Sequence, residues 1–515
     1  MTSCPSASPL VRSLPWREPE VVARALACRF GVEGLVWLDG DGSPLGRTCL
    51  LGVDPVATVR CEGLPGVRGA RDPFAQLSHL AASGQTWLGW LAYEAGAWVE
   101  PASHWKPSAL PLLWAARFDP LVRLDRQQRL LWLEGHDPGR LEAVAGCLQA
   151  LEPESAAAGS SASDLTPPAI ALDSWRWHTD RGRFAEQVAM IQALIASGDL
   201  FQANLTACCE APWPGADGAE LLALYGKLRR HCPAPFSGLV IARGGPQPEA
   251  ILSASPERFL QVSAGGAVET RPIKGTRPRH RQPQADAAAA AALVSSPKDR
   301  AENVMIVDLL RNDLGRVCRP GSIQVPQLVG LESFAQVHHL TSVVQGQLRD
   351  GLGPIDLLRA CWPGGSITGA PKLRACQRLA ALEPVPRGPY CGSLFRLEAD
   401  GSFDSSILIR SVMLQGGQLR AHAGGGIVAD SDPLAEAEEM GWKLRPLLAA
   451  MARTPRIQPC RHRRAGRWPS PGWPAPGGFH RAWRCPSTIG VCCWRTACSR
   501  PCCWSRGSRS CWRPI

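Results

Sequence analysis

Apolar and polar positions follow two different periods along this chain, and segments of the two kinds occur in irregular order. Short apolar runs bounded by Gly, Asp or Pro are typical of strands and occur near 35–38, 48–51, 86–93, 237–243, 249–254, 258–263, 267–273, 341–347, 391–397, 404–414 and 418–423. Longer segments with one apolar face predict helices near 181–197, 218–231, 284–294, 298–316, 354–359, 371–382 and 433–452. Because the elements lack a βαβ rhythm, we expect an α+β fold with antiparallel sheets.

Four regions of the chain differ in composition. We expect residues 1–151 to form an α/β or mainly β region, and residues 171–453, which carry every dense motif, to form the main domain. Residues 152–170 between them are small, polar and flanked by Pro, as linkers are. Residues 454–515 are rich in Arg, Cys and Trp and show neither a helical nor a strand period. We interpret this tail as aberrant, either unstructured or translated out of frame, and assign it no function.

The net charge of +11 suggests a nucleic-acid binder only until its distribution is considered. Residues 455–515 hold twelve of the 56 basic residues and no acidic residue, which leaves 44 basic against 45 acidic residues in the rest of the chain. A basic arm with interleaved Trp in this tail is an alternative, and a zinc module near Cys460 lacks a paired C-x-x-C. We therefore expect no nucleic-acid partner for the nearly neutral body.

Cysteine usage and hydropathy both favour a cytoplasmic protein. Outside the tail, the cysteines are scattered without metal-ligand spacing, as reduced thiols are in cytosolic enzymes. The N-terminus has no apolar segment of the signal-peptide kind. No run approaches the ~18 apolar residues that a membrane-spanning helix requires. We expect a soluble, cytoplasmic protein with no membrane partner.

Two predicted helices carry acidic residues on one face. Asp299 and Glu302 are three positions apart on one helix. On the other, Glu436, Glu439 and Lys443 follow at helical spacing after the predicted N-cap Asp432. Two such faces brought together can hold Mg²⁺, which prefers a few carboxylates, waters and an anionic ligand. The same spacing is also typical of solvated helix faces, so the pattern alone leaves both interpretations open.

Lys274 stands between Ile273 and Gly275, with three arginines within five residues. Nearby positive charge and partial burial both lower the pKa of an amine, which makes a lysine a usable nucleophile. A solvated lysine in a basic loop is the alternative interpretation of this residue taken alone.

Glycines and one arginine predict anion binding. Gly424, Gly425 and Gly426 precede the last predicted helix, where their amides can approach an anion closely, although a tight turn explains them equally well. Arg410 ends an apolar run and can offer a bidentate fork to a carboxylate, or it is a surface arginine at a strand end. The Gly-rich segment 363–372 does not follow the Walker order, so ATP is not indicated.

Taken together, these segments resemble the chorismate-utilising enzymes, which include anthranilate synthase component I, aminodeoxychorismate synthase component I and the isochorismate and salicylate synthases. The resemblance runs in order from residue 197 to residue 443, through 197–206, 255–259, 269–279, 298–316, 338–340, 363–372, 388–392 and 424–443. It implies a large fold of two stacked antiparallel β-sheets flanked by helices. The N-terminal region, with its segment 89–94, fits the family more loosely, and the resemblance implies that it is part of the same composite fold.

The resemblance also assigns roles to residues. It implies that Glu302 and Glu439 hold Mg²⁺, with Asp299 and Glu436 supporting them, and that Glu257 protonates the departing 4-hydroxyl of chorismate. The residues that match substrate-binding positions are Gly275, Thr276, His339, Thr368, Tyr390, Arg410, Gly424, Gly425, Gly426 and Lys443.

Lys274 selects a branch of the family, because anthranilate and isochorismate synthases usually carry Ala in this slot. A lysine here resembles the aminodeoxychorismate synthase branch, in which the amine attacks C2 of chorismate with loss of the 4-hydroxyl, and ammonia then adds at C4 and expels the lysine. No glutaminase motif occurs in residues 1–454, so we expect a separate glutamine amidotransferase subunit to supply the ammonia. The alternatives are an anthranilate synthase component I and an inactive ligand-binding relative.

Tryptophan binding stays open at this stage. Family members that bind tryptophan carry a Leu-Leu-(Glu/His)-Ser element, which here reads Trp37-Leu38-Asp39-Gly40, while a second, Pro-rich element at 232–237 is partly kept.

Overall fold

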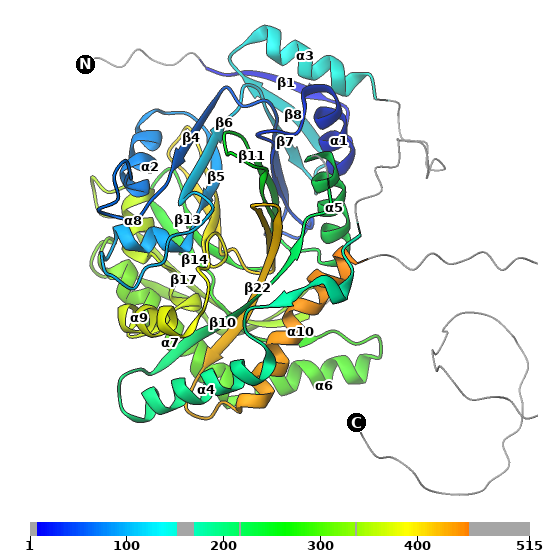
Figure 1. The fold of residues 1–515 in the computed structure, drawn as a ribbon. Coiled ribbons are helices and arrows are strands. Elements are labelled where there is room, and N and C mark those ends of the chain that lie inside the picture. Colours follow the sequence, from blue (N-terminus) through cyan, green and yellow to red (C-terminus); the bar gives the residue numbers. More distant parts are fainter. Residues whose placement is uncertain (1–7, 152–168, 216–217, 335–336, 453–515) are drawn as a thin grey trace, which may run out of the picture. The chain divides into compact units, whose positions relative to one another are not determined.

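Two antiparallel β-sheets form the frame of the protein (Figure 1). The structure is a computed structural model that describes residues 8–151, 169–215, 218–334 and 337–452. The predicted tail at 454–515 and nearly all of the predicted linker therefore lie outside the described residues.

Within the described residues, the first sheet has twelve strands. Its order is β1 (Leu10–Leu14), β8 (Leu130–Gly135), β7 (Leu121–Asp125), β3 (Thr48–Gly52), β2 (Val36–Asp39), β11 (Phe236–Ala242), β12 (Glu249–Ser255), β21 (Ser411–Gln415), β22 (Gln418–Ile427), β10 (Gln202–Pro212) and β18 (Gly369–Ala370), with β9 (Arg176–Trp177) on β10. N-terminal strand β2 pairs directly with β11.

The second sheet has ten described strands. Its order is β15 (Ile273–Pro278), β17 (Val337–Gln347), β14 (Ala267–Thr270), β13 (Arg258–Val262), β20 (Phe403–Ser406), β19 (Ser393–Leu397), β5 (Trp87–Leu91), β6 (Leu113–Arg117) and β4 (Ala57–Cys61), with β16 (Gln324–Ser333) on β17. Because β5 pairs with β19, the two predicted regions 1–151 and 171–453 share both sheets. The boundaries at 151 and 170 stay predictions.

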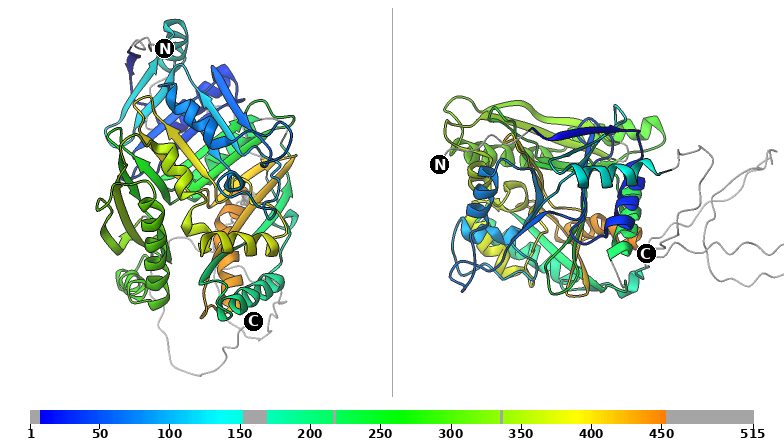
Figure 2. Two further views of the ribbon diagram at one scale, coloured as in Figure 1. Left: turned by 90° about the vertical axis from the view of Figure 1, so that its left-hand side faces the viewer. Right: turned by 90° about the horizontal axis from the view of Figure 1, so that it is seen from above.

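Helices cover the outer sides of the sheets (Figures 1 and 2). They are α1 (Pro19–Phe30), α2 (Pro73–Ala82), α3 (Pro138–Gln149), α4 (Arg181–Ala196), α5 (Gly218–His231), α6 (Pro283–Val294), α7 (Pro297–Gly315), α8 (Pro354–Cys361), α9 (Lys372–Leu382) and α10 (Pro433–Met451), with 3₁₀ turns η1 (Tyr93–Trp98), η2 (Leu172–Ser174) and η3 (Gly365–Ile367). Asp432 caps α10 by accepting a hydrogen bond from the Ala435 amide, which confirms the predicted cap.

Two large hydrophobic clusters fill the protein. One lies between the two sheets and contains Val36, while the other lies between the first sheet and helices such as α1, α5 and α10 and contains Trp37. In the same way, Leu50 belongs to the cluster of Val36, and its neighbour Leu51 belongs to the cluster of Trp37. Alternate residues of a strand point to opposite faces, so the central strands of the first sheet are apolar on both faces.

The predicted α+β class and the two stacked antiparallel sheets are confirmed, and each predicted helix is found within two residues of its predicted limits. Four predicted strands are wrong in extent, among them 341–347, which begins four residues earlier as β17 at Val337. The run 404–414 is two strands, β20 in the second sheet and β21 in the first, and 267–273 breaks between β14 and β15. The strand predicted at 418–423 continues to Ile427, so the three glycines lie in β22 rather than in a turn before a helix. Helices α1, α2 and α3 were not predicted.

Candidate active site

Most of the predicted site residues lie on β15, β17 and helix α7, and on β22 and helix α10. Glu257, Thr368, Tyr390 and Arg410 lie in segments between other elements. Lys274 lies in β15, and the pairing of β15 with β17 shifts register between Lys274 and Thr276. Gly275 at this bulge has φ +79°, and a Cβ atom there would lie 2.8 Å from Leu293 of α6. A glycine is therefore required, because an L side chain is strained at this φ and has no room.

Three lysine–glutamate pairs occupy the centre of the site. Lys274 Nζ lies 2.7 Å from Glu302 Oε1, Lys298 Nζ lies 2.6 Å from Glu436 Oε1, and Lys443 Nζ lies 2.8 Å from Glu439 Oε1. Glu302 and Glu436 are buried, whereas the Glu439 side chain is half exposed. The acidic faces predicted on α7 and α10 therefore do meet.

Strand β22 runs between these carboxylates. A Cβ atom on Gly426 would lie 2.0 Å from Glu302 Oε1, and one on Gly425 would lie 3.4 Å from Glu436 Oε2. Lys443 Nζ donates a hydrogen bond of 2.8 Å to the Gly424 carbonyl oxygen. The glycines thus allow both acidic helices to contact the backbone of one strand.

The edge of β22 that carries the glycines is open on one side. Gly424, Gly425 and Gly426 pair with β10, but β21 pairs with β22 only as far as Ala421. In the described part of the chain, no strand covers the other edge beyond that residue, so alternate amides along it are available to an anion. The predicted anion contact is therefore offered by a strand edge beside Lys443.

Glu302 and Glu439, the two predicted metal ligands, can supply only part of the coordination shell of a magnesium ion. Among the described residues, no group of three or more His, Cys, Asp or Glu side chains is placed to hold a metal ion. Glu302 and Glu439 supply oxygen ligands, and Mg²⁺ commonly takes one or two carboxylates and completes its shell with waters and substrate. The positive charge of Lys443 lowers the pKa of Glu439 and keeps this carboxylate ionised. The donor chemistry fits, and the metal stays a prediction.

The two predicted supporting carboxylates differ in their contacts. Glu436 accepts hydrogen bonds from Lys298 and from Ser431 Oγ, at 2.6 and 2.7 Å. Asp299 instead contacts Arg277, at 3.3 Å, and lies beside Gly275. Asp299 therefore contacts residues of β15 at this site.

Glu257 is a buried carboxyl group between β12 and β13. Ser366 Oγ donates a hydrogen bond of 2.7 Å to Glu257 Oε1. Burial raises the pKa of Glu257 to about 7, although Ser366, the Lys274 charge and the Ile273 amide all act to lower it. A carboxyl group that titrates near neutral pH suits general acid or base chemistry.

His339 is neutral in this environment. Its Nδ1 and Thr276 Oγ1 lie 2.9 Å apart, so β15 and β17 are joined beside Lys274. Burial, with a smaller contribution from the Arg410 charge, lowers the pKa of His339 to about 3. A neutral imidazole at this position can exchange hydrogen bonds with a ligand without adding charge.

Arg410 is a cation without an acidic partner. It has φ +51° and lies in the segment that crosses from β20 to β21. No ion pair among the described residues involves it, and burial lowers the pKa of its guanidinium. A partly buried guanidinium that lacks a counter-ion favours the binding of an anion such as a carboxylate.

The family model of the chorismate binding enzymes matches residues 40–449. Aminodeoxychorismate synthase component 1 of Salmonella typhimurium is 37% identical over 469 residues, which cover 86% of this chain and 98% of that protein.

The chain belongs to the chorismate binding enzymes.

Other relatives within the family have a different name. Anthranilate synthase component 1 of Streptomyces coelicolor is 37% identical over 378 residues, covering 71% of this chain and 72% of that protein. The crystal structure of anthranilate synthase component I from Streptococcus pneumoniae superimposes with a TM-score of 0.65 and 27% identity, over 78% of this chain and 92% of that one. The fold is thus common to several branches of the family.

The remaining predicted substrate residues, Tyr390 and Thr368, are both buried. Tyr390 is buried and its ring stacks on that of His422, with centroids 4.9 Å apart. Burial raises the pKa of Tyr390, so its hydroxyl stays protonated and able to donate. Thr368 is fully buried, and its Oγ1 donates to the Gly364 carbonyl oxygen at 2.9 Å.

Sequence reasoning missed three residues of the site. Gln202 of β10 donates a hydrogen bond of 2.8 Å to Glu302 Oε1, Lys298 pairs with Glu436, and Ser366 bonds Glu257. Lys298 had a detectable signal, since it lies one helical turn before Glu302. The other two contacts join distant segments and have no local signal.

The two elements associated with tryptophan in the family lie side by side, because Ser237 of β11 pairs with Asp39 of β2. A pocket lies beside them, lined in part by Leu38, Asp39 and Phe236. The Asp39 carboxylate accepts a hydrogen bond of 2.7 Å from Arg229 Nε.

No helix among the described residues is long and apolar enough to cross a membrane.

Proposed function

We propose that this chain is the chorismate-converting component of an aminodeoxychorismate synthase, which makes 4-amino-4-deoxychorismate, a precursor of para-aminobenzoate and folate, from chorismate and ammonia. The observation that carries the proposal is the position of Lys274, whose Nζ contacts Glu302 and whose charge acts on buried Glu257. Relatives named aminodeoxychorismate synthase component 1 support the same branch, because one matches 86% of the chain at 37% identity and others reach 41% and 45% over shorter stretches, whereas the anthranilate synthase relative matches 71% at 37%.

The substrate would be bound as a dianion. Arg410 offers an unpaired guanidinium, Lys443 an ammonium group, and β22 an open edge of amides. Tyr390 adds a protonated hydroxyl donor. These positive and hydrogen-bond-donating groups suit a small dianion that carries one carboxylate on its ring and a second on its enolpyruvyl side chain.

The reaction follows from two residues. The neutral amine of Lys274 attacks C2 of chorismate, both double bonds of the ring shift by one position, and the C4–oxygen bond breaks. Protonated Glu257 gives its proton to the departing 4-hydroxyl, which leaves as water. Ammonia then forms a bond to C4, both double bonds return to their original positions, and the C2–nitrogen bond breaks to release Lys274. Covalent catalysis thus divides one substitution into two easier steps.

A magnesium ion would be held by Glu302 and Glu439, and its chemistry there would be to neutralise a substrate carboxylate. Lys274 and Lys443 contact these two carboxylates in the structure. Both lysines would have to move away from these carboxylate oxygens when the metal binds. The Lys274 amine would then be free to reach the substrate ring.

Ammonia would come from a separate glutamine amidotransferase subunit in a heterodimer, as the term "component 1" in the names of the relatives suggests. A cytoplasmic location is compatible with the free cysteines among the described residues.

One product analysis tests the proposal. The full chain is incubated with chorismate, Mg²⁺ and ammonium, and the product is identified by mass and chromatography. We expect 4-amino-4-deoxychorismate. Anthranilate would favour the anthranilate synthase alternative, which the Streptomyces coelicolor relative supports, and absence of turnover would favour an inactive ligand-binding relative.

A further inference from the structure

Arg387 is a buried guanidinium that joins three separate segments of the chain. Its side chain is 2% exposed. It donates two hydrogen bonds to the Glu383 carboxylate, at 2.8 and 2.7 Å. It also donates to the carbonyl oxygens of Ile367 and Asn204, both at 2.7 Å. One side chain therefore fixes the end of α9, the loop at η3 and strand β10 relative to one another.

Each of these segments carries part of the substrate site. Ile367 directly precedes Thr368, and the Asn204 amide donates to the Thr368 carbonyl oxygen at 2.7 Å. Asn204 also stands opposite Gly426 in the pairing of β10 with β22. Arg387 itself lies three residues before Tyr390. The guanidinium thus sets the spacing between Thr368, Tyr390 and the glycine edge without belonging to the predicted substrate contacts.

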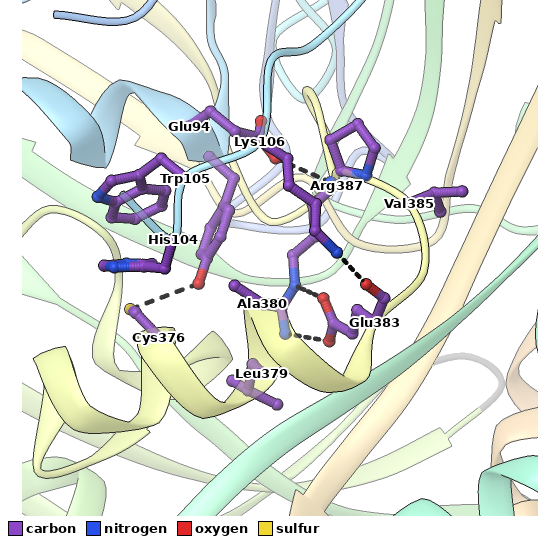
Figure 3. Close-up of a pocket in the computed structure, with 12 residues that line it drawn as sticks. Glu94, His104, Trp105, Lys106, Cys376, Leu379, Ala380, Glu383, Val385 and Arg387 are labelled. Carbon is purple, nitrogen blue, oxygen red and sulfur yellow. Dashed lines mark hydrogen bonds and ion pairs between the residues drawn. The ribbon is translucent and has the colours of Figure 1, made fainter. Parts of the chain in front are cut away.

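Glu94 holds the backbone that carries Arg387 (Figure 3). It is 2% exposed, and its Oε1 accepts hydrogen bonds from the amides of Arg387 and Gly388, at 2.8 and 3.1 Å. The ring of Tyr93 lies 4.6 Å from the Arg387 guanidinium. Glu94 Oε2 has no hydrogen-bond partner. Only one oxygen of Glu94 is therefore used as a cap, and an amide oxygen can replace it.

We propose that Glu94 and Arg387 are positioning residues for the chorismate site, which they act on through Thr368 and Tyr390. A buried polar network whose hydrogen bonds are all made holds the backbone in one geometry. A small displacement of a group that contacts the ligand then weakens the binding of that ligand strongly. The inference rests on the proposed function for the identity of the ligand. A network that only stabilised the fold would change the melting temperature and leave the affinity of folded protein for chorismate unaltered.

The test compares chorismate affinity with stability in matched variants. Calorimetry with chorismate and Mg²⁺ gives Kd without requiring turnover, and thermal unfolding gives Tm. We expect Glu94→Ala to raise Kd about tenfold, which corresponds to about 1.4 kcal/mol, and Glu94→Gln, which keeps the accepting oxygen, to stay within about twofold of wild type. Arg387→Lys, which loses the two-pronged contact with Glu383, should also raise Kd.

Arg123 of β7 provides the matched control. It makes a comparable two-pronged contact with Glu398, at 3.0 and 2.6 Å, on a strand that carries none of the site residues. Arg123→Lys should lower Tm and leave Kd unchanged. Wild-type Kd in Glu94→Ala and Arg387→Lys, or equal losses in Glu94→Ala and Glu94→Gln, would overturn the positioning roles. Wild-type protein that does not bind chorismate would contradict the proposed function instead.

Discussion

Replacing Ser366 by Ala should move the pH dependence of the reaction toward higher pH. The Ser366 hydroxyl donates a hydrogen bond of 2.7 Å to Glu257, and it favours the ionised carboxylate. Without it, burial acts against the charge with less opposition, so the pKa of Glu257 rises above its value of about 7.

The size of the shift follows from this contact. A hydrogen bond to a charged group contributes about 1.5–3 kcal/mol, and one pKa unit corresponds to about 1.36 kcal/mol. The Lys274 charge and the Ile273 amide still favour ionisation in the variant, and the protonated acid also loses a bond. We therefore expect a rise of about one unit, toward the lower end of this range.

The assay is the pH profile of kcat/KM for chorismate with saturating ammonium. Glu257 must be protonated to give its proton to the leaving hydroxyl, so activity falls as pH rises through its pKa. This descending limb should move up by about one pH unit in Ser366→Ala. Ser366→Thr keeps the hydroxyl and should retain the wild-type limb.

An unchanged limb, or one displaced to lower pH, in Ser366→Ala would refute the assignment of Glu257 as the acid. The same result in both variants would show that the hydroxyl itself has no part in the titration.

Three further predictions concern other parts of the site. Lys274→Ala should abolish the covalent adduct seen by intact mass after incubation with chorismate, whereas Lys298→Ala should retain it; an adduct that persists in Lys274→Ala rules out this nucleophile. Gly426→Ala places a Cβ atom 2.0 Å from Glu302 Oε1, so it should displace Glu302 and cost about 1–3 kcal/mol of stability in denaturant unfolding. Gly146→Ala in α3, where no neighbouring atom lies within 4 Å of the added carbon, is the control and should not destabilise the protein. Glu439→Gln should raise the Mg²⁺ concentration required for half-maximal turnover, and chelation by EDTA should remove turnover reversibly; undiminished activity in EDTA would contradict the metal.

Local signals predicted the elements on which the site is built. Helix α10 was predictable because its cap and apolar face are encoded within one segment. The crossing at Arg410 was not, because the apolar runs before and after it are alike and periodicity does not say to which sheet a strand belongs. The glycines of β22 were misassigned because glycine has a low strand propensity, which pairing with β10 overrides.

The identity of the site residues came from ordered motifs, whereas their contacts required the fold. Glu302 and Glu439 stand on helices that no local rule brings together. The Glu94 cap on Arg387 joins segments at opposite ends of the described chain, and neither residue carries a pattern that marks the other. Such polar partners depend on packing between distant elements, and a single sequence does not encode their pairing in a visible form.

The sharing of strands between early and late parts of the chain governs how this protein can be made. β2 can pair with β11 only after β11 has been synthesised, and β5 can pair with β19 only after β19 has been synthesised. Early strands therefore leave the ribosome with unpaired edges and depend on contacts of very high sequence separation, a topology that folds slowly and is exposed to aggregation meanwhile. A shortened chain limited to the motif-bearing half would expose β11 and β19 as new edges. Expression should therefore benefit from low temperature and chaperones more than from truncation.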